Sequence, residues 1–510
     1  MSKNNRAYPI IDLFAGPGGL GEGFASLYSN KGEPVFRSVI SIEKEEFAHN
    51  TLRLRHFFRS FPKGKVPKEY YDYISGELSL EALSTKYPAQ WEKAISSAVH
   101  IELGEQNHDK IQHLISKHIG RTKKWVLVGG PPCQAYSLVG RSRRMHDPLF
   151  ETDEKHFLYK EYLRIIIDHK PPVFVMENVK GLLSAKIHGE LVVTKILRDL
   201  ANPVKAIGNG SNGLKYRLYS LSHDGNLTAD ANPKLFVIKA EDHGIPQARH
   251  RMFVVGIRSD IDLKPRQLRK RNPPCVKDVI GDLPRIRSGI SKQEDSVSLW
   301  RKIIGTMATS KRKRGEDREK DLEKVILSTI ARIVKAPTST WSKEVTIPTT
   351  MKEWFSDKKL KALTGHEARA HMESDILRYM FASCYAKAAK ASPKLSDFPT
   401  SLLPNHRNVA AGCEGSMFSD RFRVQLADRV STTITSHISK DGHYFIHYDP
   451  MQCRSLTVRE AARLQTFPDN YHFEGPRTSQ YHQVGNAVPP YLARQISEVI
   501  AEILDSIPDD

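Results

Sequence analysis

The sequence predicts an α/β fold with an open sheet. Three apolar runs of strand length, at residues 8–13, 125–128 and 173–176, each end in glycine or polar residues. The first run is followed by a glycine-rich turn and a segment with helical spacing, which is the order of elements typical of α/β proteins. In such sheets, loops at the strand ends hold the binding and catalytic residues.

The first of these loops predicts a nucleotide-like cofactor. Gly16, Gly18 and Gly21 have the spacing G-x-G-x-x-G, which lets the backbone approach a ligand where a helix begins. Glu43 ends a second apolar run and is placed to hold ribose hydroxyls. The pattern leaves two cofactors open, a nicotinamide dinucleotide and S-adenosylmethionine, because both contain a ribose.

Cys133 lies on a tight turn in GGPPCQAYS, residues 129–137, directly after the apolar run at 125–128. Two glycines and two prolines make this turn rigid, so the thiol is presented at the rim of the sheet as a nucleophile. The alternative is a cysteine that only fills a gap in the core, as most free cysteines do.

Five motifs in one order resemble those of the C5-cytosine DNA methyltransferases and span nearly the whole chain. They are DLFAGPGGL (12–20), GGPPCQAYS (129–137), MENVKG (176–181), QARHR (247–251) and QVGNAVPP (483–490). The resemblance implies a Rossmann-like, S-adenosylmethionine-dependent methyltransferase sheet with helices on both faces, plus a smaller mixed target recognition domain. It also implies S-adenosylmethionine as the cofactor and double-stranded DNA as the partner.

Methylation of cytosine at carbon 5 explains the residue types in these motifs. A thiolate from Cys133 adds to carbon 6 and activates carbon 5, while Glu177 protonates or hydrogen-bonds ring nitrogen N3. Arg249 and Arg251 lower the pKa of the thiol and hold the base oxygen and phosphates, from the same face of a strand at 251–256. The ordinary alternatives are a helix-capping Glu177 and a solvated pair of surface arginines.

The resemblance also implies the cofactor pocket. Phe14 resembles the aromatic residue that packs against the adenine, Leu158 an apolar wall residue, and Asn486 a polar group at the methionine end. The acidic residue that usually contacts the adenine amino group is not plainly visible; we choose Glu105, with Glu102 nearly as good. The expected cofactor-binding set is Phe14, Gly16, Gly18, Gly19, Leu20, Glu43, Glu105, Pro132, Leu158 and Asn486.

We expect a catalytic domain at residues 1–262, a target recognition domain at 263–475, and a segment at 476–510 that returns to the catalytic domain. Helical spacing predicts a helical insertion at about 53–120. In the recognition domain we expect a helix at 358–389, strands at 420–426 and 431–449, and a packed helix within 454–471, where Arg459 and Glu460 are structural.

The target cytosine must leave the duplex, because a thiol cannot reach carbon 6 inside a stacked helix; this costs roughly a few kcal/mol. We expect the loop at 136–148, with Arg141, Arg143 and Arg144, to close over the DNA and clamp phosphates. Arg, Asn, Gln and His side chains of the recognition domain are expected to read base edges.

Composition agrees with this interpretation. A net charge of +19 over 510 residues favours a polyanionic partner. The five scattered cysteines indicate neither a zinc ribbon nor a disulfide framework, and His366 and His371 in HEARAH are too far apart to share a helix face, so we expect no metal. With no signal peptide and no run of about 18 apolar residues, we expect a cytoplasmic protein without membrane contact.

The expected function is that of a site-specific DNA (cytosine-5)-methyltransferase of a prokaryote, serving in restriction-modification or phage defence, with a nuclease as a further partner. One alternative keeps the chemistry but methylates transfer RNA. A second, an NAD-dependent oxidoreductase, leaves Cys133, Glu177 and QARHR without a function. A third is a catalytically silent DNA-binding protein.

Overall fold

The computed structural model describes residues 7–132, 158–187, 189–208, 213–227, 231–309, 317–405, 409–414 and 418–508. The chain forms two compact units. The first unit consists of residues 1–70, 79–272 and 487–510, and the second unit of residues 71–78 and 273–486.

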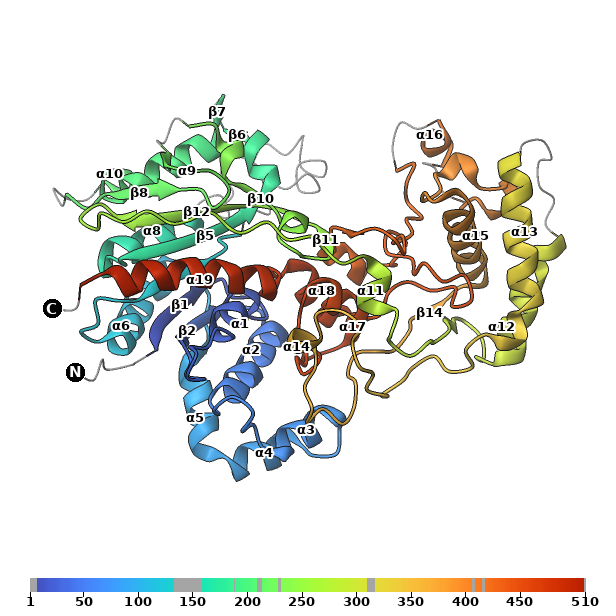
Figure 1. The fold of residues 1–510 in the computed structure, drawn as a ribbon, viewed down its shortest axis with the longest axis horizontal. Helices are drawn as coiled ribbons and strands as arrows, with labels where there is room; N and C mark the ends of the chain where they lie inside the picture. Colours follow the sequence, from blue (N-terminus) through green and yellow to red (C-terminus); the bar gives the residue numbers. More distant parts are fainter. Residues whose placement is uncertain are drawn as a thin grey trace. The chain divides into compact units, whose positions relative to one another are not determined.

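The first unit is built on a mixed sheet, which confirms the predicted α/β class (Figure 1). Among the described residues the strand order is β3-β2-β1-β4-β5-β12-β8-β9, and β10 also pairs with β12. The first five strands in this order are parallel, whereas β12 runs antiparallel to β5, β8 and β10. The strands are β1 (Tyr8–Leu13), β2 (Phe36–Glu43), β3 (Ala98–His100), β4 (Val126–Gly129), β5 (Val173–Val179), β8 (Tyr216–Tyr219), β9 (Asn226–Leu227), β10 (Val237–Lys239) and β12 (His250–Arg258).

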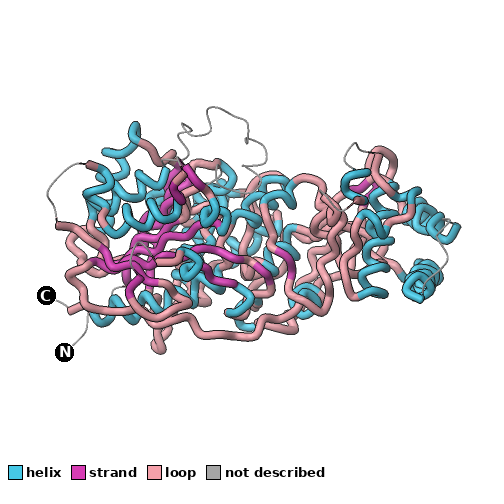
Figure 2. Tube along the Cα trace, turned by 90° about the horizontal axis from the view of Figure 1, so that it is seen from above, coloured by secondary structure: helices cyan, strands magenta, loops and turns pink. Residues whose placement is uncertain are grey.

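Alternate residues of the central strands enter two different cores, one on each face of the sheet. Ile11 and Leu127 belong to a core that α6 and α8 cover, whereas Ile10 and Val126 belong to a core that α1 and α19 cover. Helices therefore lie on both faces, as predicted (Figure 2). The helices of this unit are α1 (Gly19–Ala25), α2 (Glu46–Arg59), α4 (Leu80–Lys86), α5 (Pro88–Ser97), α6 (His108–Ile119), α8 (Leu158–His169), α9 (Val192–Ala201), α10 (Pro203–Ile207) and α19 (Pro490–Ser506); α3 (Lys68–Ser75) begins in this unit and ends in the second.

The segment at 53–120 is not the purely helical insertion that we predicted. It contains β3, which pairs with β2 and belongs to the main sheet, and its first helix, α2, already begins at Glu46. A strand of three residues is too short to display an alternating pattern, so the helical spacing around it dominates the sequence signal.

Helix α1 packs closely against α19 because two glycines of α1 face it. A Cβ atom at Gly19 would lie 2.3 Å from the carbonyl oxygen of Val488. At Gly23, a Cβ atom would lie 2.4 Å from the Cβ atom of Ala493 and 2.5 Å from the carbonyl oxygen of Pro490. This contact joins the C-terminal helix to the glycine-rich loop at the start of the chain.

The second unit combines helices with long irregular segments and very short strands. Its helices are α11 (Val276–Ile280), α12 (Val297–Gly305), α13 (Asp317–Ala331), α14 (Lys352–Phe355), α15 (Glu373–Ala389), α16 (Val409–Cys413), α17 (Val458–Leu464) and α18 (Arg477–Asn486), and β13 (Gly289–Ile290) pairs with β14 (Ala370–His371). The residues that the structure describes in 273–486 contain no helix long and apolar enough to span a membrane, and the same holds for those of the first unit.

Two element predictions for this unit were wrong. The helix expected at 358–389 begins only at Glu373, because Gly365 has a positive φ of 72° and Ala370–His371 form β14, which pairs with β13. In the segments expected to form strands, the described residues contain one strand, β15 (Ser431–Thr432). There the side chain of Gln425 accepts from the N–H of Thr432 and donates to the carbonyl of Tyr444, so it takes backbone groups that a ladder needs.

The predicted packed helix within 454–471 is α17, and buried arginines hold it. Arg454 forms a two-pronged ion pair with Glu460 at 2.6 and 2.7 Å, and Glu460 also accepts from the N–H of Thr457 at the helix start. Arg459 donates to the backbone carbonyls of Thr364 and Tyr471. Arg459 and Glu460 are thus structural, as predicted.

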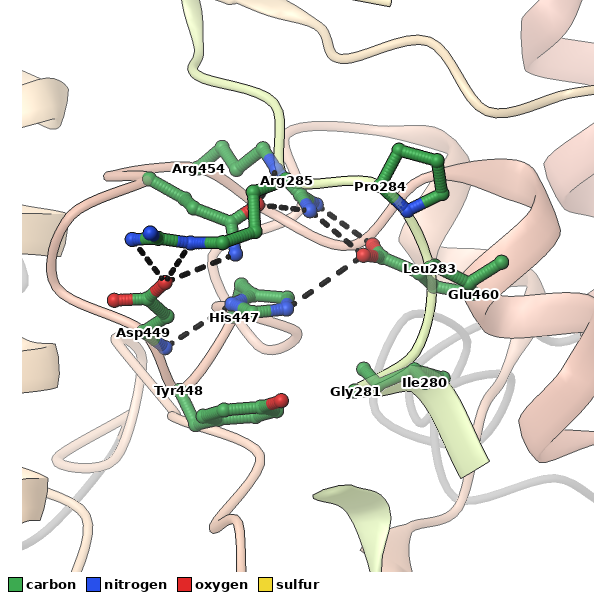
Figure 3. Close-up of a pocket in the computed structure, with 11 residues that line it drawn as sticks. Ile280, Gly281, Leu283, Pro284, Arg285, His447, Tyr448, Asp449, Arg454 and Glu460 are labelled. Carbon is green, nitrogen blue, oxygen red and sulfur yellow. Dashed lines mark hydrogen bonds and ion pairs between the residues drawn. The ribbon is translucent and has the colours of Figure 1, made fainter. Parts of the chain in front are cut away.

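A small polar cavity lies next to this network (Figure 3). His447 faces Glu460 across 3.6 Å, and the ring of Tyr448 stacks on His447. Arg285 pairs with Asp449 at 2.9 Å on the other side. Opposite charges on the lining balance, and the cavity contains none of the site residues that we predicted.

His366 and His371 of HEARAH are buried in the same unit. His366 bonds to the hydroxyl of Thr457 and to the carbonyl of Pro284, and His371 packs against Tyr379. Within the described parts of the chain, His, Cys, Asp and Glu side chains nowhere gather in a group of three suited to a metal ion.

We predict that Gly23→Ala destabilises the protein, because the new methyl group would overlap the backbone of α19. The expected loss in the free energy of unfolding is about 1–3 kcal/mol, measured by urea denaturation. Gly213→Ala is the control, since nothing lies within 4 Å of a Cβ atom at Gly213. Equal stability of the two variants would contradict the packing argument.

We also predict that the second unit loses stability in mild acid. Burial lowers the pKa of His366 and His447 to about 4 and that of His371 to about 3. In the unfolded chain, each of these histidines takes up a proton near pH 6.5. The free energy of unfolding therefore falls as the pH drops from 6.5 toward 4, by about 1.4 kcal/mol per pH unit for each histidine. Hydrogen exchange of peptides from 273–486 at pH 7 and pH 5 measures this loss, and His371→Gln should reduce it.

Candidate active site

Glu43 holds the glycine-rich loop through its carboxylate. Its Oε2 atom accepts from the N–H of Gly16 at 2.7 Å, and its Oε1 atom accepts from the N–H groups of Lys44 and Glu45 at 2.9 and 2.8 Å. A carboxylate offers about four acceptor sites. One therefore remains for a ribose hydroxyl, which fits the predicted role of Glu43.

The loop itself is shaped to receive a ligand. Gly16 and Gly18 have positive φ angles of 57° and 95°, and a Cβ atom at Gly16 would meet nothing within 4 Å. Phe14 adopts a φ of 58°, which is uncommon for a residue with a side chain. Strained backbone held at the carboxyl end of a central strand is typical of a binding loop. The loop formed by Phe14, Gly16 and Gly18 is thus suited to bind S-adenosylmethionine.

Gly19 and Leu20, two further residues of the predicted cofactor-binding set, pack against the C-terminal part of the chain. Gly19 allows the close contact with Val488, and the side chain of Leu20 is buried in the core under α19. Only the backbone of these two residues is therefore available to a cofactor.

A buried ion cluster fixes α1 against α2. Glu22 pairs with Arg55 at 2.6 Å and also with Arg59. Burial alone would raise the pKa of Glu22, but the two guanidinium groups lower it to about 2. Sequence reasoning missed this cluster; its signal is one acidic residue inside a glycine-rich helix and two arginines four residues apart in the next helix.

Asp12, directly before the loop, was also missed. It is 1% exposed, and neither carboxylate oxygen has a hydrogen-bond partner of good geometry within the described residues. Burial raises the pKa of Asp12 to about 8; the charge of Glu43 adds to the rise, and the N–H of Gly21 offsets part of it. Asp12 is therefore largely protonated near neutral pH.

The two candidates for the adenine contact lie after β3. Glu102 pairs with Lys44 at 2.6 Å, two residues beyond the end of the strand. Glu105 begins a short 3-10 helix, and its side chain is 87% exposed. The choice between these two residues stays a prediction.

Glu177 and Arg251 meet on one face of the sheet. In the antiparallel pairing of β12 with β5, Arg251 lies opposite Val179, so Arg251 and Glu177 are diagonal neighbours on the same face. The Nε atom of Arg251 lies 3.1 Å from Oε1 of Glu177. The loop that leads to Cys133 also reaches this carboxylate, because a Cβ atom at Gly130 would lie 2.8 Å from Oε2 of Glu177.

The charged groups of Glu177, Arg249 and Arg251 influence one another's pKa values. Burial raises the pKa of Glu177, and the positive charges of Arg251 and Arg249 counteract the rise. Burial and the neighbouring Arg251 lower the pKa of Arg249, while Glu177 raises it. The structure thus brings three of the four predicted catalytic residues together, and none of the three is a solvated surface group.

Several predicted residues border or fall outside the described parts. Cys133, Arg141, Arg143 and Arg144 lie outside the residues that the structure describes. Pro132 is the last residue described before them, and Leu158 is the first one after them, at the start of α8.

Asn486 is the last residue of α18 and of the second unit. Its side-chain amide lies 3.2 Å from Nδ1 of His482. The next residue, Ala487, belongs to the first unit and lies against Gly19.

A family model described as C-5 cytosine-specific DNA methylase matches residues 76–502. The chain belongs to this family. It is therefore a DNA (cytosine-5)-methyltransferase that uses S-adenosylmethionine, as predicted, and the oxidoreductase alternative has no support.

Similar proteins cover almost all of this methyltransferase. The type II methyltransferase M.Bpa9945I of Bacillus paralicheniformis is 32% identical over 97% of this chain and 99% of its own. The type II methyltransferase M.DdeI of Desulfomicrobium norvegicum is 24% identical over 98% of this chain and 89% of its own. A solved structure of the Entamoeba histolytica methyltransferase EhMeth covers 98% of this chain and 99% of its own, with 13% identity and a TM-score of 0.43.

We predict that Gly130→Ala lowers kcat without unfolding the enzyme. Gly130 does not have a positive φ, so alanine is allowed by the backbone, but its methyl group would displace the Glu177 carboxylate. A displacement near 1 Å is expected to cost about 100-fold in kcat. Methyl transfer from radiolabelled S-adenosylmethionine measures the rate, and circular dichroism checks the fold. An unchanged kcat would show that Gly130 does not set the position of Glu177.

Proposed function

We propose that this methyltransferase modifies cytosine within a specific sequence of double-stranded DNA, through a transient covalent bond between Cys133 and carbon 6 of the flipped base. The observation that carries the proposal is the largely buried Glu177 carboxylate, 14% exposed, which lies beside Arg251 and against Gly130, three residues before Cys133. A carboxyl group at this place stands where the base ring must be held if the thiol is to attack it.

The raised pKa of Glu177 suits the role that we assign to it. A carboxyl group that keeps its proton more readily can donate to ring nitrogen N3 of cytosine, which makes carbon 6 easier to attack. Arg251 orients the carboxylate by its ion pair, and Arg249 adds positive charge from a buried position. Both arginines favour the thiolate form of Cys133 and hold the oxygen of the base.

S-adenosylmethionine supplies the methyl group. When it is bound, Glu43 would hold a ribose hydroxyl, Gly16 and Gly18 would let the backbone approach it, and Phe14 would pack on its adenine. We assign the wall of the pocket to Pro132 and Leu158, the methionine end to Asn486, and the adenine amino group to Glu105 or Glu102.

We assign target recognition to the second unit and catalysis to the first. The second unit consists of residues 71–78 and 273–486. The net charge of +19 of the whole chain supports duplex DNA as the ligand of the protein.

The biological role that we propose is modification in a type II restriction-modification or phage-defence system, in the cytoplasm of a prokaryote. The names of the bacterial relatives support it. A nuclease that cleaves the same unmethylated sequence is then the expected partner.

Bisulfite sequencing of DNA from cells that express the protein tests the function directly, because it reports the modified base and its sequence context. We expect one short recognition sequence with methylated cytosine. Scattered methylation, or methylation of transfer RNA alone, would refute the proposal.

We predict that Cys133→Ser abolishes methyl transfer and that duplex DNA with 5-fluorocytosine at the target traps the wild-type enzyme through Cys133. Fluorine cannot leave as the carbon 5 proton does, so the thioether persists and mass spectrometry finds it. Cys275→Ser is the matched control, since Cys275 caps α11, a position that serine favours. A trapped adduct at any other residue would overturn the mechanism.

A further inference from the structure

Trp341 is presented to solvent by a rigid piece of backbone. It is 56% exposed, whereas Trp125 and Trp300 are buried and Trp91 and Trp354 are half-buried. Backbone hydrogen bonds join its segment to the HEARAH segment: the N–H of Ser342 donates to His366 and the N–H of Ala368 to Thr340. An exposed aromatic ring on anchored backbone loses little conformational entropy when it binds a partner.

The C-terminal part of α3 holds the same segment. The Nζ atom of Lys343, two residues beyond Trp341, donates to the carbonyl oxygen of Ser75 at 2.9 Å. Tyr71 donates to Asp357 at 2.6 Å, and Asp72 pairs with Lys361 at 2.8 Å. Residues 71–78 thus belong to the second unit although the chain around them belongs to the first.

The charge around Trp341 selects one kind of partner. Residues 335–361 contain six lysines and three acidic residues, and all six lysines are exposed. A flat aromatic ring on a lysine-rich segment matches the sugars and bases of a nucleic acid between its phosphates. Val345 and Ile347 of this segment are also exposed, at 37% and 69%, so a protein is the competing partner that the experiment must exclude.

We propose that Trp341 contacts the DNA substrate and that residues 71–78 of the insertion are its positioning element. This inference rests on the assignment of target recognition to the second unit. It also assigns a role to the insertion. Residues 71–78 bind Lys343 and thereby keep the neighbouring Trp341 in the conformation that contacts the duplex.

Quenching of tryptophan fluorescence by acrylamide tests the contact. In the described chain Trp341 is the exposed tryptophan, so it should account for most of the quenchable signal, and Trp341→Phe should remove that signal. A duplex carrying the sequence mapped by bisulfite sequencing should protect the wild-type signal. If the duplex binds by fluorescence anisotropy and is methylated while the signal stays fully quenchable, the inference is wrong although the proposed function stands.

Steady-state kinetics test the positioning role. Lys343→Met and Tyr71→Phe should raise the KM for DNA about tenfold with kcat nearly unchanged, as the loss of one charged hydrogen bond near 1.4 kcal/mol implies. Both variants should speed hydrogen exchange at 339–347, and Lys343→Arg, which keeps a donor, should restore both values.

Lys86→Met is the matched control, because Lys86 lies in the same insertion but pairs with Glu69 within the first unit. It should leave the KM and the exchange at 339–347 unchanged. If Lys343→Met behaves like this control, residues 71–78 do not position Trp341. A second copy of the chain could instead bind at Trp341, while the duplex leaves the Trp341 fluorescence open to quenching by acrylamide. That result would identify a protein interface and overturn the proposal.

Discussion

A carboxylate withdrawn from water must be compensated, and the group of Glu177, Arg249 and Arg251 that we propose as the catalytic centre depends on that constraint. Glu177 lies on a buried strand, and the charge of its carboxylate is stabilised by the guanidinium group of Arg251 at 3.1 Å. Both side chains are 14% exposed, and loss of either partner would leave the other charge largely desolvated and uncompensated. The ion pair exists because β12 runs antiparallel to β5 in one register, since a slip of one residue would turn Arg251 to the other face.

Glycines allow segments of the first unit that are distant in sequence to pack closely against one another. Gly19 and Gly23 let the C-terminal helix α19 lie against the loop that follows β1, and Gly130 lets the turn before Cys133 lie against Glu177. The loop after β1 is also held by Glu43, and α1 by the ion cluster around Glu22. The cofactor loop and the carboxylate are thus supported by elements that are far apart in sequence, which explains why motifs at both ends of the chain belong to one enzyme.

The second unit reaches stability by a different route. Its sheets are small, and its centre contains buried arginines that bind carboxylates and backbone carbonyls, among them Arg454 with Glu460 and Arg463 with Asp282 and Asp469. Such bonds are directional, so they fix the course of long irregular segments that a hydrophobic core alone would leave variable. Irregular but rigid backbone is a suitable support for the target recognition that we propose for this unit.

Local sequence was sufficient for the features that depend on neighbouring residues. The apolar runs of β1, β4 and β5, the glycine loop, the helix α17 and the identity of Glu177, Arg249 and Arg251 follow from short patterns and from five ordered motifs. Features that depend on distant partners did not follow. β3 is too short to display a pattern. The described segments at 420–426 and 431–449 contain only the short strand β15, because the Gln425 side chain takes backbone groups that a ladder needs. α15 begins late because Gly365 has a positive φ and β14 pairs with β13. Tertiary structure alone decided the protonation of Asp12, the contact of Gly130 with Glu177 and the place of residues 71–78 in the second unit, because burial and close approach are set by side chains that fold in from elsewhere in the chain.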